Sequence, residues 1–339
     1  MILRFTTLAL LAPFALALSP RDIPSDTPVS SLISSAKASL SNGNSNEALT
    51  YFDVAIQRDP SNYLTIFQRG ATYLSLGRNS KASQDFDAVL AIKPDFEGAL
   101  MQRAKIKAKS ADWAGARKDY ETAKRKKGPE IEGLEEAQGA AVLAAEAEKK
   151  GDWEACVSQA GVAIMTASAA LGLRQMRARC RFERGEVQEG VYDLAHVLQI
   201  SPGLVDPHMQ IASMLFYSVG DLEKGIAQTR KCLHSDPDSK SCQKLFRRQK
   251  KVDKAYGQIK QNMDMRMFNS AVKILVGSGD ATGLIQDVKE DVQAAKEAGS
   301  IHQNSPNALY TTLVEITCEA YREVCPSSLQ FSNKLTRSR

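Results

Sequence analysis

The chain has 339 residues, of which 43% are hydrophobic and 24% are charged, as in ordinary globular proteins. Only 6% are aromatic, while Ala, Leu, Lys, Glu and Gln recur throughout, so the composition favours helices over a strand-rich core. The formal net charge of +5 is small and dispersed, and its densest run, Lys124–Lys127, precedes Gly128-Pro129, where a helix should stop. Cations are expected at a helix C-terminus, so the charge indicates no nucleic-acid partner.

The N-terminus has the pattern of a signal peptide. A short segment ending in Arg4 precedes an apolar run from Phe5 to Leu18, which Pro13 interrupts and which ends in small residues suited to cleavage. The run is too short to cross a bilayer comfortably, and no later stretch of the sequence approaches that length. We therefore predict a signal peptide at residues 1–18 and no membrane insertion; a buried first helix is the alternative.

A repeat of 34 residues follows. Gly43 and Gly77 are 34 residues apart (77 − 43). Each is followed at the same offsets by alanine, phenylalanine, a small or aliphatic residue and proline: Ala48, Phe52, Ala55 and Pro60, then Ala82, Phe86, Val89 and Pro94. A third copy continues with Ala116, Tyr120, Ala123 and Gly128-Pro129. Later copies are marked by Gly151, Gly185 with Pro202, Gly220 with Pro237 and, in weaker register, Ala271.

Each repeated position suits a helix–turn–helix unit. Glycine adopts the backbone conformation that the tight turn between the two helices needs, and alanine at their crossing lets the backbones approach. The aromatic residue fills the space between pairs, and proline stops the second helix. Six or seven such units in phase resemble the tetratricopeptide (TPR) family, with an irregular helical bundle as the alternative. The resemblance implies an all-α superhelix of about seven helix pairs, each contacting its neighbours.

The phase of the repeat predicts the domain limits. We expect an N-terminal subdomain at residues 29–128 (repeats 1–3), a spacer at 129–136, a middle subdomain at 137–242 (repeats 4–6) and a C-terminal subdomain at 243–324. The last contains repeat 7 and the first helix of an incomplete repeat 8, whose Leu313 and Ile316 are expected to be uncovered. A divergent tail occupies residues 325–339. The second helix of repeat 3 is expected to run on through the spacer as one long helix.

The cysteines fall into two kinds. Cys156 and Cys180 lie inside apolar helical patterns, so we predict that both are buried and reduced. Cys232 and Cys242 flank His234–Asp238, a predicted turn between helices, and a bridge between them would close a short loop. No other Cys or His pair nearby has the spacing of a zinc site, so no metal is predicted.

Within the TPR family, the arrangement resembles the J-domain-bearing TPR co-chaperones of the endoplasmic reticulum lumen, of the DnaJ subfamily C type. The resemblance covers roughly residues 29–324 and includes the opening repeats, the spacer and the stretch from Arg230 to Cys242. It implies a disulfide between Cys232 and Cys242, binding of unfolded polypeptide by the N-terminal repeats, and recruitment of a BiP-type chaperone by a J domain. A J domain needs a His-Pro-Asp tripeptide, which this sequence lacks, so we expect a truncated or differently spliced form that holds clients.

The resemblance also indicates where clients bind. TPR superhelices present the first helix of each pair on their concave face, where this sequence is apolar with a few cations. The candidate client-binding residues are Ile33 and Leu40 in repeat 1, Leu64, Phe67 and Leu74 in repeat 2, and Met101 in repeat 3. Such a face suits sequence-tolerant binding of extended apolar segments. For each of these side chains, packing between helices is the alternative. Later repeats present more charge, as at Arg174, Arg177 and Arg181.

Three other functions are less well supported. The carboxylate clamp of cytosolic TPR relatives needs Lys, Asn and Arg where this chain has Ile33, Lys37, Gln68, Gly98 and Gln102, so the charged fork is missing. The four histidines are scattered without paired acids, and no phosphate loop or cofactor motif is present, so neither an enzyme nor a cofactor is predicted. A scaffold for one dedicated folded partner remains the main alternative to client binding.

Overall fold

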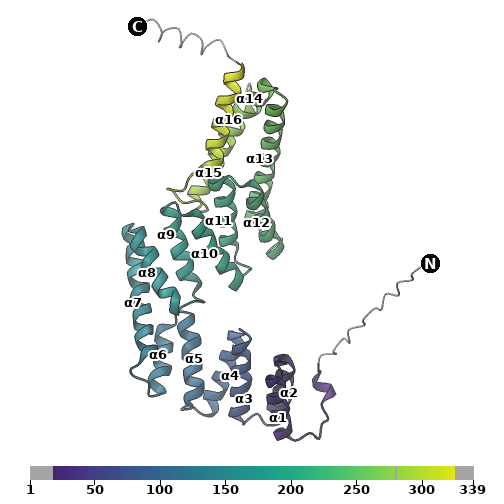
Figure 1. Ribbon diagram of the computed structural model, residues 1–339, viewed down its shortest axis with the longest axis vertical. Helices are drawn as coiled ribbons and strands as arrows, with labels where there is room; N and C mark the ends of the chain where they lie inside the picture. Colours follow the sequence, from purple (N-terminus) through teal and green to yellow (C-terminus); the bar gives the residue numbers. More distant parts are fainter. Residues whose placement is uncertain (1–17, 279–280, 325–339) are drawn as a thin grey trace, which may run out of the picture. The chain divides into compact units, whose positions relative to one another are not determined.

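The computed structural model describes residues 18–278 and 281–324. All of the predicted signal peptide except Leu18 lies outside the described residues, as do Cys325 and the tail at residues 325–339. The described chain is built almost wholly of helices (Figure 1), so the predicted all-α class is confirmed. It divides into two compact units, residues 1–134 (unit 1) and residues 135–339 (unit 2). The finer division into three subdomains stays a prediction.

Unit 1 contains the first three helix pairs. In each pair the two helices pack together: α1 with α2, α3 with α4 and α5 with α6. The elements in chain order are η1 (Pro20–Asp22), α1 (Val29–Ser41), α2 (Ser45–Arg58), α3 (Tyr63–Ser75), α4 (Asn79–Ile92), α5 (Glu97–Lys109), α6 (Trp113–Thr122) and the beginning of α7 (Pro129–Lys150).

The turn inside each of these pairs has a left-handed backbone. Gly43 and Gly77 have φ angles of +80° and +72°, which glycine adopts without steric penalty. Ala111 takes the equivalent place in the third pair with φ of +65°, where its Cβ adds about 1–2 kcal/mol of strain. The close approach predicted within a pair is also present, since a Cβ on Gly70 would lie 2.9 Å from the ring of Phe86.

Unit 2 contains the remaining helices and one two-stranded ribbon. The ribbon is antiparallel, with Gly277 opposite Thr282 and Ser278 opposite Ala281. The elements after α7 are α8 (Trp153–Thr166), α9 (Leu171–Glu183), α10 (Val187–Ile200), α11 (Val205–Ser213), the π-helix η2 (Met214–Val219), α12 (Leu222–Ser235), α13 (Lys240–Asp264), α14 (Phe268–Val276), β1 (Gly277–Ser278), β2 (Ala281–Thr282), α15 (Leu284–Glu297) and α16 (Ala308–Val324).

The spacer forms part of a different helix from the one predicted. Helix α6 ends at Thr122, and the chain then turns through Lys124 and Gly128, whose φ angles are +61° and +133°. The second helix of repeat 3 therefore does not run on through residues 129–136. Those residues begin α7, because Pro129 at the first helical position lacks only an N–H that the helix does not use. The predicted boundary at residue 243 falls inside α13.

Helix α16 is covered, against the prediction for an incomplete repeat 8. It packs on α14, η2 and α15, and these contacts bury Leu313 completely in the hydrophobic core of unit 2. Ile316 is half-buried against the same core. The expectation that both side chains are uncovered is wrong for Leu313, because α15 and the π-helix supply neighbours that the repeat pattern did not indicate.

Four cysteines form two disulfides. Cys232 at the end of α12 is bonded to Cys242 at the start of α13, as the resemblance implied. Cys156 of α8 is bonded to Cys180 of α9, so the prediction that these two stay reduced is wrong, although both are fully buried as expected. Packing of α8 on α9 brings their Cα atoms to 6.3 Å, which is within the range that a disulfide needs.

Candidate functional site

An open, mainly apolar groove lies between α1 and α3 in unit 1. Its volume is about 350 Å³. Two of the predicted client-binding side chains, Leu40 of α1 and Phe67 of α3, lie on its wall. The other residues that line it are Lys37, Phe52, Gln68, Ala71, Thr72 and Ser75. The structure therefore brings Leu40 and Phe67 together on one surface.

Contacts behind the groove hold Phe67 in place. Its ring lies edge-on to Phe96, with centroids 5.1 Å apart, and tilted against Phe86 at 5.7 Å. Such aromatic pairs contribute about 0.5–1.5 kcal/mol beyond the area that they bury. Leu40 is half-buried against Ala36, Ala48 and Phe52. Packing thus restricts the side chains of the apolar wall before a client binds. Binding a segment would therefore cost these side chains little conformational entropy.

Gln68 adds a polar group to the groove. Its side-chain oxygen is buried and accepts no hydrogen bond from the described residues. A buried acceptor without a donor is unfavourable by about 1–3 kcal/mol. Because this oxygen is buried, the surface that the groove offers to a bound segment is mainly apolar.

The remaining candidate residues are not part of this groove. Leu64 is 48% exposed but does not line it. Ile33, Leu74 and Met101 are half-buried, each packed against a different core cluster. Contact of these three side chains with clients stays a prediction.

A row of ion pairs crosses the helix pairs of unit 1, and sequence analysis missed it. Arg69 donates two hydrogen bonds to Asp85, at 2.9 and 2.6 Å, and a third to Asp53 at 2.8 Å. Arg103, one repeat later, makes the same contacts with Asp119 and Asp87. Hydrogen bonds to Asp85 outweigh the effect of burial and raise the pKa of Arg69 above its ordinary value. The signal in the sequence was an Asp placed 16 residues on either side of each Arg.

The arginines of α9 take part in a similar arrangement. Arg174, Arg177 and Arg181 were predicted to present charge on an open surface, but all three surround the buried carboxylate of Asp193. Their side chains are only 12%, 17% and 21% exposed. They are therefore better described as a partly buried cluster.

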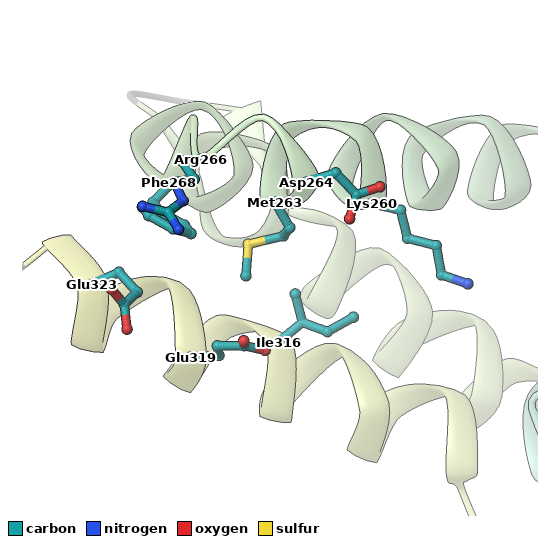
Figure 2. A pocket seen from close by; sticks show the side chains of 8 residues that line it. All are labelled: Lys260, Met263, Asp264, Arg266, Phe268, Ile316, Glu319 and Glu323. Atoms are coloured by element: carbon teal, nitrogen blue, oxygen red, sulfur yellow. The ribbon is translucent and has the colours of Figure 1, made fainter.

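Two of the pockets in unit 2 are alternative candidates for a polypeptide site. One, of about 480 Å³, is lined by α10, α11 and α12, with apolar side chains such as Val191 and Leu198 beside His208 and Lys231. The other, of about 610 Å³, lies between α13 and α16. Figure 2 shows Met263 and Ile316 facing each other across it, with Glu319 and Glu323 along α16. Its remaining lining residues are Lys260, Asp264, Arg266 and Phe268, and this mixed charge suits an extended apolar segment less well.

One histidine does meet a carboxylate. His302 Nδ1 lies 3.1 Å from Glu183, and its ring packs on Phe182 with centroids 5.1 Å apart. Burial lowers the pKa of His302 below its ordinary value even though Glu183 opposes the shift. The pair joins the loop before α16 to α9. Among the described residues no cluster of three metal-ligating side chains occurs, and no helix is long and apolar enough to cross a membrane.

The helix pairs and their repeated turn have the architecture of tetratricopeptide repeats. Residues 65–96 match the tetratricopeptide-repeat family. The crystal structure of the P58(IPK) TPR domain superposes with a TM-score of 0.67 at 22% identity, covering 90% of this chain and 84% of that one. At this identity the match supports the fold alone, which agrees with the predicted TPR architecture.

Sequence relatives confirm the predicted resemblance to TPR and J-domain co-chaperones. The chain is 48% identical over 327 residues to the "Tetratricopeptide repeat and J domain-containing co-chaperone DNJ1" of Fusarium oxysporum f. sp. lycopersici, covering 94% of this chain and 63% of that protein. It is 28% identical over 231 residues to the DnaJ homolog subfamily C member 3 of Rattus norvegicus, covering 65% of this chain and 45% of that protein. The chain thus spans less than two thirds of the length of these relatives.

Proposed function

We propose that this chain binds unfolded or misfolded polypeptides through the groove between α1 and α3. The observation that carries the proposal is the apolar wall formed by Leu40 and Phe67. Hydrophobic contact is non-directional, so such a surface accepts many sequences.

We place this activity in the endoplasmic reticulum lumen. The signal-peptide pattern at residues 1–18 and the two disulfides support that assignment, because disulfides persist in oxidising compartments. The relatives are named as J-domain-containing co-chaperones. This sequence contains no His-Pro-Asp tripeptide, so we propose a hand-off of clients to a BiP-type chaperone only by analogy with that family. We propose no enzymatic activity.

Replacing Ala71 with glutamate should weaken client binding by about tenfold or more, because a charge in the apolar groove would lose hydration on client binding. Ala71 is exposed and lines the groove, so the change removes no core contact. Phe67→Ala would be less informative, since it also removes contacts with Phe86 and Phe96. The measurement is suppression of aggregation of several unrelated unfolded proteins by the whole chain.

Ala91→Glu is the matched control, because Ala91 is also exposed but lies on α4 away from the groove. It should protect clients as the unsubstituted chain does, and both variants should keep their helical melting temperature. Equal protection by the Ala71 and Ala91 variants would contradict client binding in the groove between α1 and α3. Failure of the unsubstituted chain to protect any unfolded protein would favour a scaffold for one dedicated folded partner.

A further inference from the structure

The ion pairs of α3, α5 and α9 follow one pattern, with one change. Arg69, Arg103 and Arg177 each donate from Nε and Nη2 to an aspartate 16 residues later, namely Asp85, Asp119 and Asp193. The Nη1 atoms of Arg69 and Arg103 also donate to an aspartate 16 residues earlier. These are Asp53 of α2 and Asp87 of α4, at 2.8 and 2.7 Å.

The residue 16 positions before Arg177 is Gly161 (177 − 16), which has no carboxylate. The place is equivalent in space, since a Cβ built on Gly161 of α8 would lie 3.7 Å from Nη1 of Arg177. At the two other sites the aspartate side chain here is 49% and 58% exposed. The location is therefore one that a group from outside the chain can reach.

Local charge adds to this difference. Arg103 and Lys107 balance Asp87 and Asp119, whereas Arg174, Arg177 and Arg181 surround Asp193 alone and leave a surplus of two positive charges.

The contacts of Arg174 are weak, and Arg181, although its Nη1 donates to Asp193 at 2.7 Å, keeps one donor without a partner among the described residues. Arg174 Nη1 lies 3.9 Å from Asp193, and its hydrogen bonds to the Ser168 carbonyl are long, at 3.4 and 3.3 Å. Arg181 Nε is buried and donates to no described residue. Burial, with repulsion from Arg177, lowers the pKa of Arg174.

We propose that Arg177 and Arg174 bind a carboxylate of an acidic polypeptide segment at the place that Gly161 leaves open. A carboxylate is the chemistry that Asp53 and Asp87 supply at the two equivalent places. A bound carboxylate would accept from Nη1 of Arg177 and offset the surplus charge, and such charge-assisted hydrogen bonds are among the stronger ones in proteins. This site lies in unit 2, and it does not depend on the groove between α1 and α3.

The test is fluorescence anisotropy of the whole chain with a labelled oligoglutamate peptide whose C-terminus is amidated. Gly161→Asp should weaken binding by about tenfold, because the new side chain supplies the missing carboxylate internally. Gly161→Asn is the matched control, nearly identical in shape but neutral, and should bind within about twofold of the unsubstituted chain. Arg174→Gln leaves the Arg177–Asp193 pair intact and should weaken binding several-fold. This variant still tests the site if the Gly161→Asp chain does not fold.

Oligoglutamine with a free C-terminus separates the two sources of carboxylate. Binding of oligoglutamate alone assigns the site to acidic side chains, as proposed, whereas binding of oligoglutamine alone would assign it to a chain terminus and overturn that choice. The site itself is overturned if neither peptide binds, or if Gly161→Asp and Arg174→Gln both bind like the unsubstituted chain. Equal loss in the Asp and Asn variants would also overturn it, since the effect would then be steric.

Discussion

Replacing Asp85 with alanine should lower the free energy of unfolding by about 3 kcal/mol, since breaking a buried ion pair leaves a charge without its partner. The side chain of Asp85 is 7% exposed and accepts two hydrogen bonds from Arg69, which is itself 22% exposed. We expect a value at the lower end of the range for buried pairs, because the guanidinium reaches some water and keeps Asp53. Chemical denaturation monitored by helical circular dichroism measures the change.

The control acts on the same arginine. Asp53→Ala removes the third hydrogen bond of Arg69, but the Asp53 side chain is 49% exposed, so the loss should be below about 1 kcal/mol. A similar loss in both variants would mean that burial does not set the strength of these pairs.

Replacing both Cys156 and Cys180 with alanine should lower stability by about 3.5 kcal/mol on the chain-entropy model. The two residues are 24 positions apart, and the bond closes the chain between them into a loop. The closed loop lowers the conformational entropy of the unfolded chain, which stabilises the folded state. The Cys232–Cys242 bond closes a separation of 10, so its removal should have the smaller effect, about 2.7 kcal/mol. Peptide mapping without reductant should recover both bridged pairs. Free thiols at Cys156 and Cys180 would instead agree with the prediction from the sequence that these two cysteines are reduced.

The periodic features of the fold were predictable because each follows from one residue type at a fixed offset. Gly43 and Gly77 marked turns that need a positive φ, and Ala82 and Phe86 marked the fully buried contact between paired helices. The spacer was misread because the second helix of repeat 3 was extended through Gly128-Pro129, where the structure begins a new helix. The apolar pattern of residues 129–136 is helical in both interpretations and does not distinguish them.

Features that depend on packing between helices were not predictable in the same way. Cys156 and Cys180 each lie in an apolar pattern, and only the packing of α8 on α9 shows that they meet. The row of arginines and aspartates has a spacing of 16, which the 3.6-residue period of one helix does not reveal.

The candidate site was predicted in part. Positions on the first helix of each repeat identified Leu40 and Phe67, which line one groove. The same rule also selected Ile33, Leu74 and Met101, which do not line this groove and stay predictions. A repeat position gives the direction of a side chain from its own helix, whereas its exposure depends on the neighbouring helices. The groove's polar member, Gln68, was considered only as a position of the carboxylate clamp.

The central claim is that unfolded polypeptides lie in the groove between α1 and α3, and site-specific photocrosslinking tests it most directly. A benzophenone amino acid would replace Ala71, which lines the groove, or Ala91, which is exposed on α4 outside it. With an unfolded client present, we expect a crosslinked adduct from position 71 and little or none from position 91. Adducts of equal yield at both positions, or an adduct from position 91 alone, would contradict the proposed binding site.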